Sequence, residues 1–332
     1  MLNTKEVLYS LDDVAIQPAS ESFIEHRGEC NTLIDGFLPI FTSPMPNVVD
    51  ENTLDLYINA KINPVIPRSC GTFESKLSLS CDYDIFAAYS LDEAERLCEC
   101  EQFDDIEVKV LIDIANGNMS RLMSIIERIK LKYPQFIIMA GNVANPETYK
   151  LLCDCGADYV RLSVGTGSAC NTATFTGIYY PMASLIDKCA SMNLGAKIIA
   201  DGGISNYRNA IKALALGADY VMMGGALNKL KDSAGIIQEV RDINGEWHQY
   251  KLYYGMASIK GQEKLNRKNI SAPEGKTVMN PISDMTIAEF ANEFDAYLKS
   301  SMSYCNIKDI KDFRNVNTNI ISESAQKQFN KD

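Results

Sequence analysis

Histidine is nearly absent from this chain, which has only His26 and His248 among its 332 residues. Histidine-based metal centres, HExxH metallopeptidases and Ser-His-Asp hydrolases would each have to use one of these two residues. Neither of them lies in a matching motif. The chemistry of the protein is therefore expected to depend on other side chains.

Long hydrophobic runs and a surplus of basic residues are also missing. No apolar run reaches the roughly 18 residues that a membrane helix needs, and the start MLNTKEVLYSLDD lacks the basic and apolar segments of a signal peptide. The 32 Lys and Arg residues are outnumbered by 43 Asp and Glu residues, which gives a net charge of −11. We therefore expect a cytoplasmic protein with a small-molecule partner, and no binding to nucleic acid or to an anionic membrane.

The ten cysteines are expected to be reduced in that compartment. Cys98 with Cys100 and Cys153 with Cys155 form CxC pairs rather than the CxxC pairs of zinc ribbons and thioredoxin-like motifs. A metal or redox role remains the weaker interpretation. Buried structural thiols are the favoured one.

Short apolar runs alternate with amphipathic stretches from about residue 36 to 226, as in βα units around a parallel sheet. The eight expected strands span residues 37–44, 62–67, 84–90, 107–115, 135–142, 158–164, 196–203 and 219–226. Eight parallel strands are the number that closes a (β/α)8 TIM barrel. The fold class predicted is therefore α/β, with a flap insertion after strand eight and a C-terminal helical tail.

Helix signals support this alternation. Asn145, followed by Pro146, opens a helix that ends at Gly156, and Asn206 opens another that ends at Gly217. We predict a single TIM-barrel domain over residues 1–332. Its expected parts are a polar lead-in (1–35), the barrel core (36–242), a hairpin and mobile flap (243–280), and a helix with a partly disordered polar tail (281–332).

Glycine pairs follow the last two expected strands, as Gly202-Gly203 and Gly224-Gly225. Loops at these positions of a barrel often bind phosphate, and glycine lets backbone N–H groups approach its oxygens closely. Tight turns without a ligand are the alternative. Asp201, just before the first pair, has a carboxylate that can accept hydrogen bonds from a ribose diol.

A glycine-rich loop with one thiol, Gly165 to Thr172, follows the sixth expected strand. Cys170 in this loop is placed to act as a thiolate nucleophile at the barrel mouth; an incidental loop cysteine is the alternative. Asp113, at the end of the fourth strand, is expected to face the same mouth or to cap the following helix.

Several motifs follow one another in an order and at spacings that chance does not readily produce. They are Leu11-Asp12-Asp13-Val14, Ala140-Gly141-Asn142-Val143, Gly165 to Thr172, Ala200-Asp201-Gly202-Gly203-Ile204, Tyr254-Gly255-Met256 and Glu274-Gly275-Lys276-Thr277-Val278. On these motifs the chain resembles the IMP dehydrogenase and GMP reductase family over nearly its whole length. The resemblance implies a (β/α)8 barrel that is usually a homotetramer.

Within the family the chain resembles the reductases more than the dehydrogenases. Only about sixteen residues follow Pro67 before the third expected strand, too few for the CBS modules of dehydrogenases. The segment Lys251 to Met256 matches a reductase motif, and the Arg-Tyr pair of dehydrogenase flaps is not visible. The alternatives are oxidation of IMP to XMP with NAD, as in IMP dehydrogenase, and a non-catalytic homologue that binds purine nucleotides.

The reductase resemblance implies that NADPH reduces GMP, a purine nucleoside monophosphate, to IMP with release of ammonia. Cys170 would form a covalent adduct at C2 of the purine, and Thr172 with Glu274 would relay a proton. The residues implied to bind the nucleotide are Ser168, Asp201, Gly202, Gly203, Gly224, Gly225, Gly255, Met256, Ala257 and Gly275. Those implied for the nicotinamide are Asp113, Ile114, Ala115, Val164 and Gly165. The carbonyls of Gly165, Gly167 and Cys170 would hold a monovalent cation such as K⁺.

The chain departs from the family pattern at several of these places. It has Cys170-Asn171-Thr172-Ala173 where Cys-Thr-Thr-Arg is usual, and Gly165-Thr166-Gly167 where Gly-Pro-Gly is usual. Ile270-Ser271 stands where reductases have an aromatic residue and an arginine, which would help to hold the dinucleotide. NADPH against NADH, and GMP against a deoxy or modified guanine nucleotide, therefore remain open.

Overall fold

An eight-stranded parallel sheet forms the centre of the computed structural model, which describes residues 6–100, 103, 106–265 and 272–329. The strand order is β2-β9-β8-β7-β6-β5-β4-β3. The strands are β2 (Ile40–Thr42), β3 (Val65–Ile66), β4 (Phe86–Tyr89), β5 (Lys109–Asp113), β6 (Ile137–Val143), β7 (Tyr159–Leu162), β8 (Lys197–Asp201) and β9 (Tyr220–Met223). Each lies within one predicted segment or overlaps it, so all eight predicted strands are confirmed.

The sheet closes between its first and last strands through a parallel bridge from Phe41 to Asn63. The amide of Asn63 donates to the carbonyl of Ile40 at 3.0 Å, and the amide of Thr42 donates to the carbonyl of Asn63 at 2.9 Å. These bonds join β2 to the residues before β3. The predicted (β/α)8 TIM barrel is therefore confirmed.

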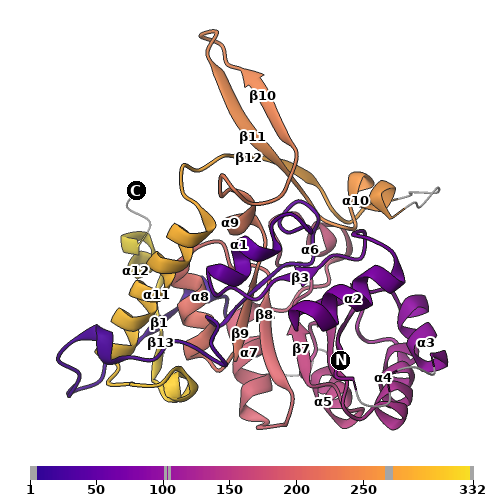
Figure 1. The fold of residues 1–332 in the computed structure, drawn as a ribbon. Helices are drawn as coiled ribbons and strands as arrows, with labels where there is room; N and C mark the ends of the chain where they lie inside the picture. Colours follow the sequence, from indigo (N-terminus) through magenta and orange to yellow (C-terminus); the bar gives the residue numbers. More distant parts are fainter. Residues whose placement is uncertain (1–5, 101–102, 104–105, 266–271, 330–332) are drawn as a thin grey trace.

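Most helices surround the sheet on its outside, whereas the short helices α6 and α9 lie at the end of the barrel where the strands finish (Figure 1). They are α1 (Leu54–Asn59), α2 (Phe73–Tyr83), α3 (Leu91–Glu99), α4 (Ser120–Lys132), α5 (Pro146–Asp154), α6 (Thr172–Thr176), α7 (Met182–Ser191), α8 (Tyr207–Ala215) and α9 (Gly225–Asn228). The predicted caps are present: Asn145 accepts from the amide of Glu147 and Asn206 from that of Asn209, which satisfies N–H groups that the first helical turn leaves unpaired.

One end of the barrel is filled by aromatic side chains. Phe41, Phe86 and Tyr220 are buried near the amino ends of their strands, and the partly buried Tyr159 packs against them, with ring centroids 5.0 to 6.2 Å apart. Aromatic rings at these separations pack favourably edge to face. This end of the barrel is therefore filled, and the cavity described below lies at the opposite end, where the strands finish.

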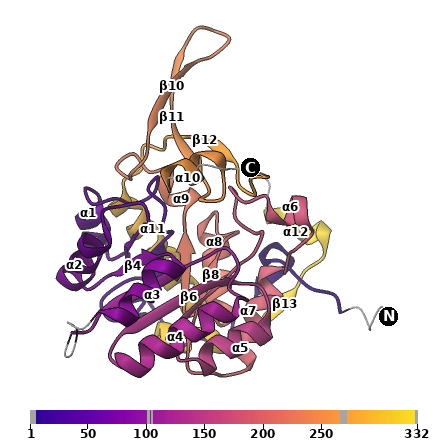
Figure 2. The same ribbon diagram turned by 90° about the vertical axis from the view of Figure 1, so that its right-hand side faces the viewer.

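A long hairpin rises from that opposite end (Figures 1 and 2). It consists of β10 (Ile237–Arg241) and β11 (Trp247–Tyr254), and β12 (Thr277–Pro281) pairs with the base of β11. The hairpin begins at Ile237, earlier than the predicted 243. The predicted mobile flap between β11 and β12 contains α10 (Ile259–Lys264), and residues 266–271 lie outside the described residues.

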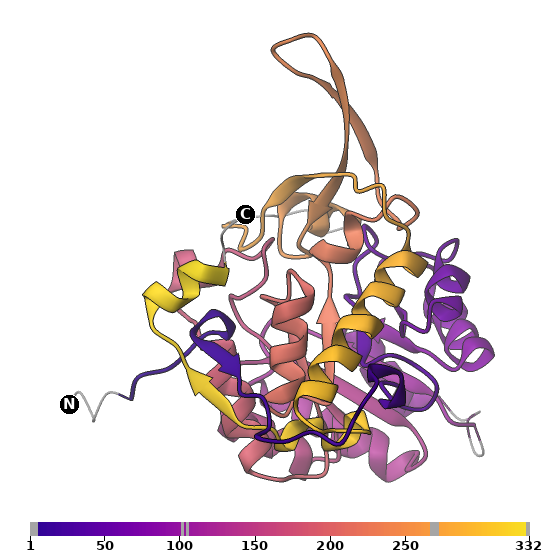
Figure 3. The same ribbon diagram turned by 90° about the vertical axis from the view of Figure 1, so that its left-hand side faces the viewer.

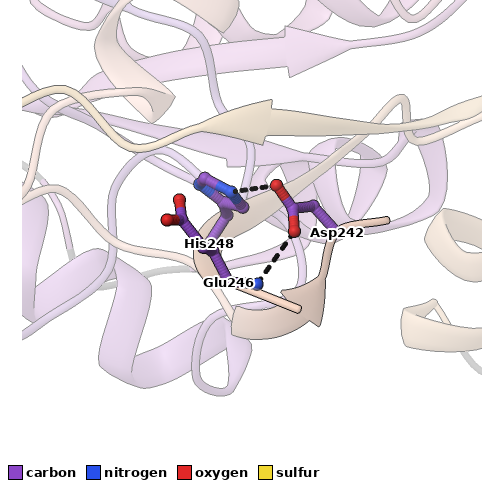
Figure 4. A group of neighbouring side chains, drawn as sticks. All are labelled: Asp242, Glu246 and His248. Atoms are coloured by element: carbon purple, nitrogen blue, oxygen red, sulfur yellow. Dashed lines mark hydrogen bonds and ion pairs between the residues drawn. The ribbon is translucent and has the colours of Figure 1, made fainter. Parts of the chain in front are cut away.

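The hairpin tip is held by a hydrogen-bonded turn (Figure 4). Oδ1 of Asp242 accepts from the amides of Asn244 and Glu246 at 2.9 and 2.8 Å, and Oδ2 of Asp242 lies 3.2 Å from Nε2 of His248. One aspartate thus satisfies the backbone donors of the tight connection. These bonds account for the grouping of Asp242, Glu246 and His248 at the exposed tip of the hairpin.

Segments near the two ends of the chain pair on one side of the barrel (Figure 3). After α11 (Ile287–Tyr304) come a 3-10 helix (Ile310–Asn315), β13 (Thr318–Ile320) and α12 (Glu323–Phe329). β13 pairs with β1 (Val14–Ile16), which lies between the 3-10 helices Leu11–Asp13 and Arg27–Glu29. The predicted polar tail therefore contains a paired strand and a helix up to residue 329.

The longest helix of the described residues is α11, with 18 residues. Neither it nor any other described helix is long and apolar enough to cross a membrane.

Candidate active site

A cavity of about 930 Å³ opens at the carboxyl ends of the barrel strands. It is lined by every residue that the sequence and its resemblance single out: Asp113, Ile114, Ala115, Val164, Gly165, Gly167, Ser168, Cys170, Thr172, Asp201, Gly202, Gly203, Gly224, Gly225, Gly255, Met256, Ala257, Glu274 and Gly275. These residues come from loops far apart in the sequence. Barrel topology brings them together because parallel strands end at the same rim.

Three side chains form a continuous chain of contacts within this cavity. Sγ of Cys170 donates to the hydroxyl of Thr172 at 3.3 Å, and that hydroxyl donates to Oε2 of Glu274 at 2.7 Å. The carboxylate can take the proton of the hydroxyl that donates to it. The hydroxyl oxygen can at the same time accept a proton from a neighbouring group. The arrangement can therefore pass protons between Glu274 and a molecule beside Cys170.

Backbone bonds hold the glutamate loop against the cysteine loop. The amide of Asn171 donates to the carbonyl of Glu274 at 2.6 Å, and the amide of Lys276 donates to the carbonyl of Ala169 at 3.0 Å. Cys170 and Gly275 are paired as an antiparallel bridge. Glu274 is therefore positioned by the main chain and does not depend on its side-chain contact alone.

Glycines make this close approach possible. A Cβ atom on Gly275 would lie 2.6 Å from the amide nitrogen of Ser258, and one on Gly255 would lie 2.9 Å from the carbonyl oxygen of Ala169. Both neighbours are main-chain atoms, which cannot move aside as a flexible side chain can. Residues 255–258 thus touch the cysteine loop at Ala169 and the glutamate loop at Gly275, in both cases backbone to backbone.

Hydroxyl groups surround the glycine pair after β9. A Cβ on Gly224 would lie 2.5 Å from the phenol oxygen of Tyr253 and 2.9 Å from the hydroxyl of Ser43, and one on Gly225 would lie 3.3 Å from the hydroxyl of Ser168. Burial, reinforced by the Asp201 carboxylate, raises the pKa of Tyr253 to about 12. The phenol is therefore a hydrogen-bond donor at neutral pH.

Sequence reasoning quoted Tyr253 within a motif but gave it no role. It also missed Arg161, a buried side chain of β7 that lines the cavity between two carboxylates. NH1 of Arg161 donates to Oδ1 of Asp113 at 2.6 Å, and NH2 donates to Oδ2 of Asp201 at 2.8 Å. The signal was present, since an arginine in the middle of an apolar strand needs a buried partner.

Electrostatics keep this arginine charged. Burial alone disfavours the charge, but the carboxylates of Asp201 and Asp113 outweigh it and raise the pKa of Arg161. Asp113 was expected to contact the nicotinamide or to cap a helix, and Asp201 to bind ribose. In the structure both are ion-pair partners of Arg161 as well as cavity residues.

Two features of the sequence analysis lie away from this site. The CxC cysteines are free thiols and partly buried, rather than fully buried as expected, and none belongs to a possible metal-binding cluster among the described residues. The departure at Ile270-Ser271 lies outside the described residues.

A comparison with family models matches residues 85–330 to the IMP dehydrogenase / GMP reductase domain. The chain belongs to the IMP dehydrogenase and GMP reductase family. Its strands from β4 to β9, the cysteine loop and the glutamate loop all lie within the matched range.

Curated relatives carry the name GMP reductase. The chain is 33% identical over 234 residues to GMP reductase of Aliivibrio fischeri strain MJ11, covering 69% of this chain and 65% of the relative. It is 34% identical over 263 residues to GMP reductase 2 of Bos taurus, covering 69% of this chain and 74% of the relative. It is also 34% identical over 229 residues to the GMP reductase of Buchnera aphidicola (strain Tuc7), covering 67% of this chain and 63% of the relative. The matches thus span less than two thirds of the length of the first and third relatives.

Proposed function

We propose that this family member is a purine nucleotide oxidoreductase of the GMP reductase type, which converts GMP to IMP and ammonia with a reduced nicotinamide dinucleotide. The observation that carries the proposal is the contact chain from Cys170 through Thr172 to Glu274 inside the cavity. The names of the curated relatives point to the same reaction.

Cys170 would begin the reaction. Its thiolate adds to C2 of the purine ring, forms a C–S bond and makes C2 tetrahedral. The C2–N bond to the exocyclic amine then breaks, and the purine remains attached to sulfur. Such covalent catalysis divides one difficult displacement into two easier steps.

Thr172 and Glu274 would supply protons. A poor leaving group such as the C2 amine departs only when it is protonated, and the 2.7 Å bond from Thr172 to Glu274 provides a path from a carboxyl group to the neighbourhood of Cys170. In the overall balance GMP, one hydride and two protons give IMP and ammonium. The thiolate leaves again when the C2–S bond breaks.

A nicotinamide dinucleotide would occupy the remaining part of the cavity. The wall runs from Cys170 past Asp113 and Ala115 to Ser90 and Arg121, and the volume of about 930 Å³ is near the upper end for ligand pockets. The segments Asp113–Ala115 and Val164–Gly165 would hold its nicotinamide end. When bound, the reduced nicotinamide supplies the hydride that C2 receives. NADPH is the proposed cofactor.

The nucleotide would lie with its phosphate among Ser168, Gly203, Gly224, Gly225 and Tyr253. Backbone N–H groups and hydroxyl groups are suitable donors for phosphate oxygens, and the globally acidic charge of the chain makes such local donors necessary. The purine edge would rest on Gly255, Met256, Ala257 and Gly275, which line the same cavity.

Asp201 would bind the ribose together with Gly202. Oδ2 of Asp201 accepts from Asn142 at 2.7 Å and from NH2 of Arg161 at 2.8 Å, whereas Oδ1 accepts no hydrogen bond from a described residue. A free carboxylate oxygen in the cavity suits a ribose hydroxyl, which favours a ribonucleotide over a deoxyribonucleotide.

A monovalent cation such as K⁺ would be held by the carbonyls of Gly165, Gly167 and Cys170. Carbonyl oxygens are suitable ligands for such an ion, and the three belong to one loop whose turn is closed by a 2.9 Å bond from the amide of Cys170 to the carbonyl of Gly167. The cation would stiffen the loop that carries the thiol. A homotetramer in solution, as implied by the resemblance, is part of the same proposal.

The proposal is tested by offering the purified protein GMP or IMP with either nicotinamide cofactor. Oxidation of NADPH with formation of IMP from GMP is the expected result. Reduction of NAD⁺ with IMP as substrate would instead identify a dehydrogenase. Binding of GMP without turnover under any condition would identify a non-catalytic homologue.

A further inference from the structure

Arg161 is the only described side chain that joins a proposed ribose-binding residue to a proposed nicotinamide-binding residue. Its side chain is 6% exposed, and it lies in β7 beside Gly141 of β6. A Cβ on Gly141 would lie 2.7 Å from both Cβ and the carbonyl oxygen of Arg161, so glycine at this position permits the close approach of the two strands. The backbones of β6 and β7 therefore lie close together at the residue that carries the guanidinium.

The guanidinium is shared unequally between its two partners. Asp201 receives NH2 at 2.8 Å and Nε at 3.3 Å, whereas Asp113 receives only NH1 at 2.6 Å. Arginine suits this position because its planar fork presents several fixed donors at once. One rigid group thereby determines the orientation of both carboxylates.

A second cation and an amide complete the network. Nε of Arg68 lies 3.2 Å from Oδ2 of Asp113, as an ion pair without hydrogen-bond geometry, and Asn142 donates to Asp201 at 2.7 Å. The two carboxylates and two guanidinium groups are at most 14% exposed. The two negative and two positive charges balance. A ligand that forms a hydrogen bond with one of these groups therefore changes the strength of the hydrogen bonds between the others.

We propose that Arg161 is a positioning residue that couples the two ligand sites, so that binding of the purine nucleotide tightens binding of the nicotinamide dinucleotide. This inference rests on the proposed function. A ribose hydroxyl that donates to Asp201 fixes that carboxylate and, through the shared guanidinium, fixes Asp113. The second ligand then meets an ordered site and loses less conformational entropy. By thermodynamic linkage, the dinucleotide must tighten binding of the purine nucleotide by the same factor.

Lysine at position 161 would break the coupling and keep the charge. A single ammonium group cannot present the parallel N–H groups that hold two carboxylates on opposite sides. Arg128 supplies a matched control, because this exposed arginine of α4 pairs with Glu95 at 2.8 Å on the outside of the barrel. Arg128→Lys removes the same fork from a place that faces neither ligand.

The test is isothermal titration calorimetry of GMP binding with and without saturating NADP⁺, which carries no hydride and so permits no turnover. For the wild type and Arg128→Lys we expect NADP⁺ to tighten GMP binding at least about fivefold, the lower end of measured couplings. For Arg161→Lys we expect no tightening, while each ligand alone still binds. Asp113→Asn, which removes the charge that Arg161 shares, is expected to bind NADP⁺ more weakly and to lose the tightening as well, when GMP binding is measured at an NADP⁺ concentration that saturates this variant.

The outcomes separate the two proposals. Ligands that bind independently in the wild type, or coupling that survives in both Arg161→Lys and Asp113→Asn, would overturn the inference and leave the proposed function standing. If Arg161→Lys does not fold, Asp113→Asn decides. A wild-type protein that binds neither GMP nor NADP⁺ overturns the proposed function, and the inference with it.

Discussion

The hydroxyl of Thr172 donates a 2.7 Å hydrogen bond to the carboxylate of Glu274, across 102 residues of sequence. The same hydroxyl accepts from Sγ of Cys170 at 3.3 Å. A thiol, a hydroxyl and a carboxylate are thus connected without a histidine. The scarcity of histidine in this chain is compatible with acid-base chemistry for that reason.

Replacing Glu274 by glutamine should slow turnover of GMP by about 10² to 10⁴-fold, the usual contribution of a general acid or base. The amide keeps the size of the side chain but cannot exchange a proton with Thr172. The measurement is kcat with GMP and NADPH. Glu263→Gln on the exposed face of α10 serves as the control and should retain wild-type turnover. Equal rates for the two variants would remove Glu274 from the mechanism.

Replacing Gly275 by alanine should lower kcat by about 10²-fold, because the new methyl group would push the glutamate loop away from Ala257 and Ser258 and so move Glu274 relative to Thr172. Its Cβ would lie 2.6 Å from the amide nitrogen of Ser258 and 2.9 Å from the carbonyl carbon of Ala257. Gly195→Ala is the matched control, since nothing lies within 4 Å of its Cβ position. Steady-state kinetics with a melting curve for each variant make the comparison. Wild-type kcat in Gly275→Ala would contradict the packing argument.

Replacing Tyr253 by phenylalanine should weaken GMP binding by about 10 to 100-fold, the effect of losing one hydrogen bond to a charged group. Guanosine, which has no phosphate, should bind the variant and the wild type equally. Calorimetry with both ligands separates these cases. Tyr250→Phe, higher on the hairpin, is the control. An equal loss for guanosine would mean that Tyr253 shapes the pocket and does not contact the phosphate.

Lys251 should make stability depend on pH. Its Nζ donates to the carbonyl of Ser233 at 2.6 Å and to that of Leu230, and burial lowers its pKa from 10.5 to about 8. Between these values the unfolded chain binds the proton that the folded chain has released, so stability rises with pH.

The measurement for Lys251 is urea unfolding of the wild type and Lys251→Met at several pH values. Relative to the variant, the wild type should gain up to about 1.4 kcal/mol per pH unit from about pH 8 toward 10.5. Below pH 8 the difference between the two should be nearly constant. A difference that stays constant across the whole range would show that Lys251 keeps its proton when folded.

The sequence predicted the barrel well because its signals are local. Each strand is an apolar run bounded by turn residues, and caps such as Asn145 and Asn206 mark the helices between them. The cysteine loop was predicted by composition and, with Thr172 and Glu274, by family resemblance. Their contact needs the fold, because main-chain bonds at Asn171 and Lys276 bring the two loops together.

Two features could not be predicted from local pattern. The pairing of β1 with β13 joins two three-residue strands that lie in polar segments at opposite ends of the chain. Neither segment has a hydrophobic periodicity of its own. Arg161 was visible as a charge within a strand, but its partners Asp113 and Asp201 lie 48 and 40 residues away. Only the closed barrel makes them neighbours.

The most direct test of the account is the stoichiometry of products formed from GMP and NADPH by the wild type and by Cys170→Ala. We predict that the wild type forms IMP, ammonium and oxidised cofactor in equal amounts, that Cys170→Ala forms none, and that Cys155→Ala behaves as wild type. Turnover of GMP by Cys170→Ala, or oxidation of NADPH without equal ammonium, would contradict it.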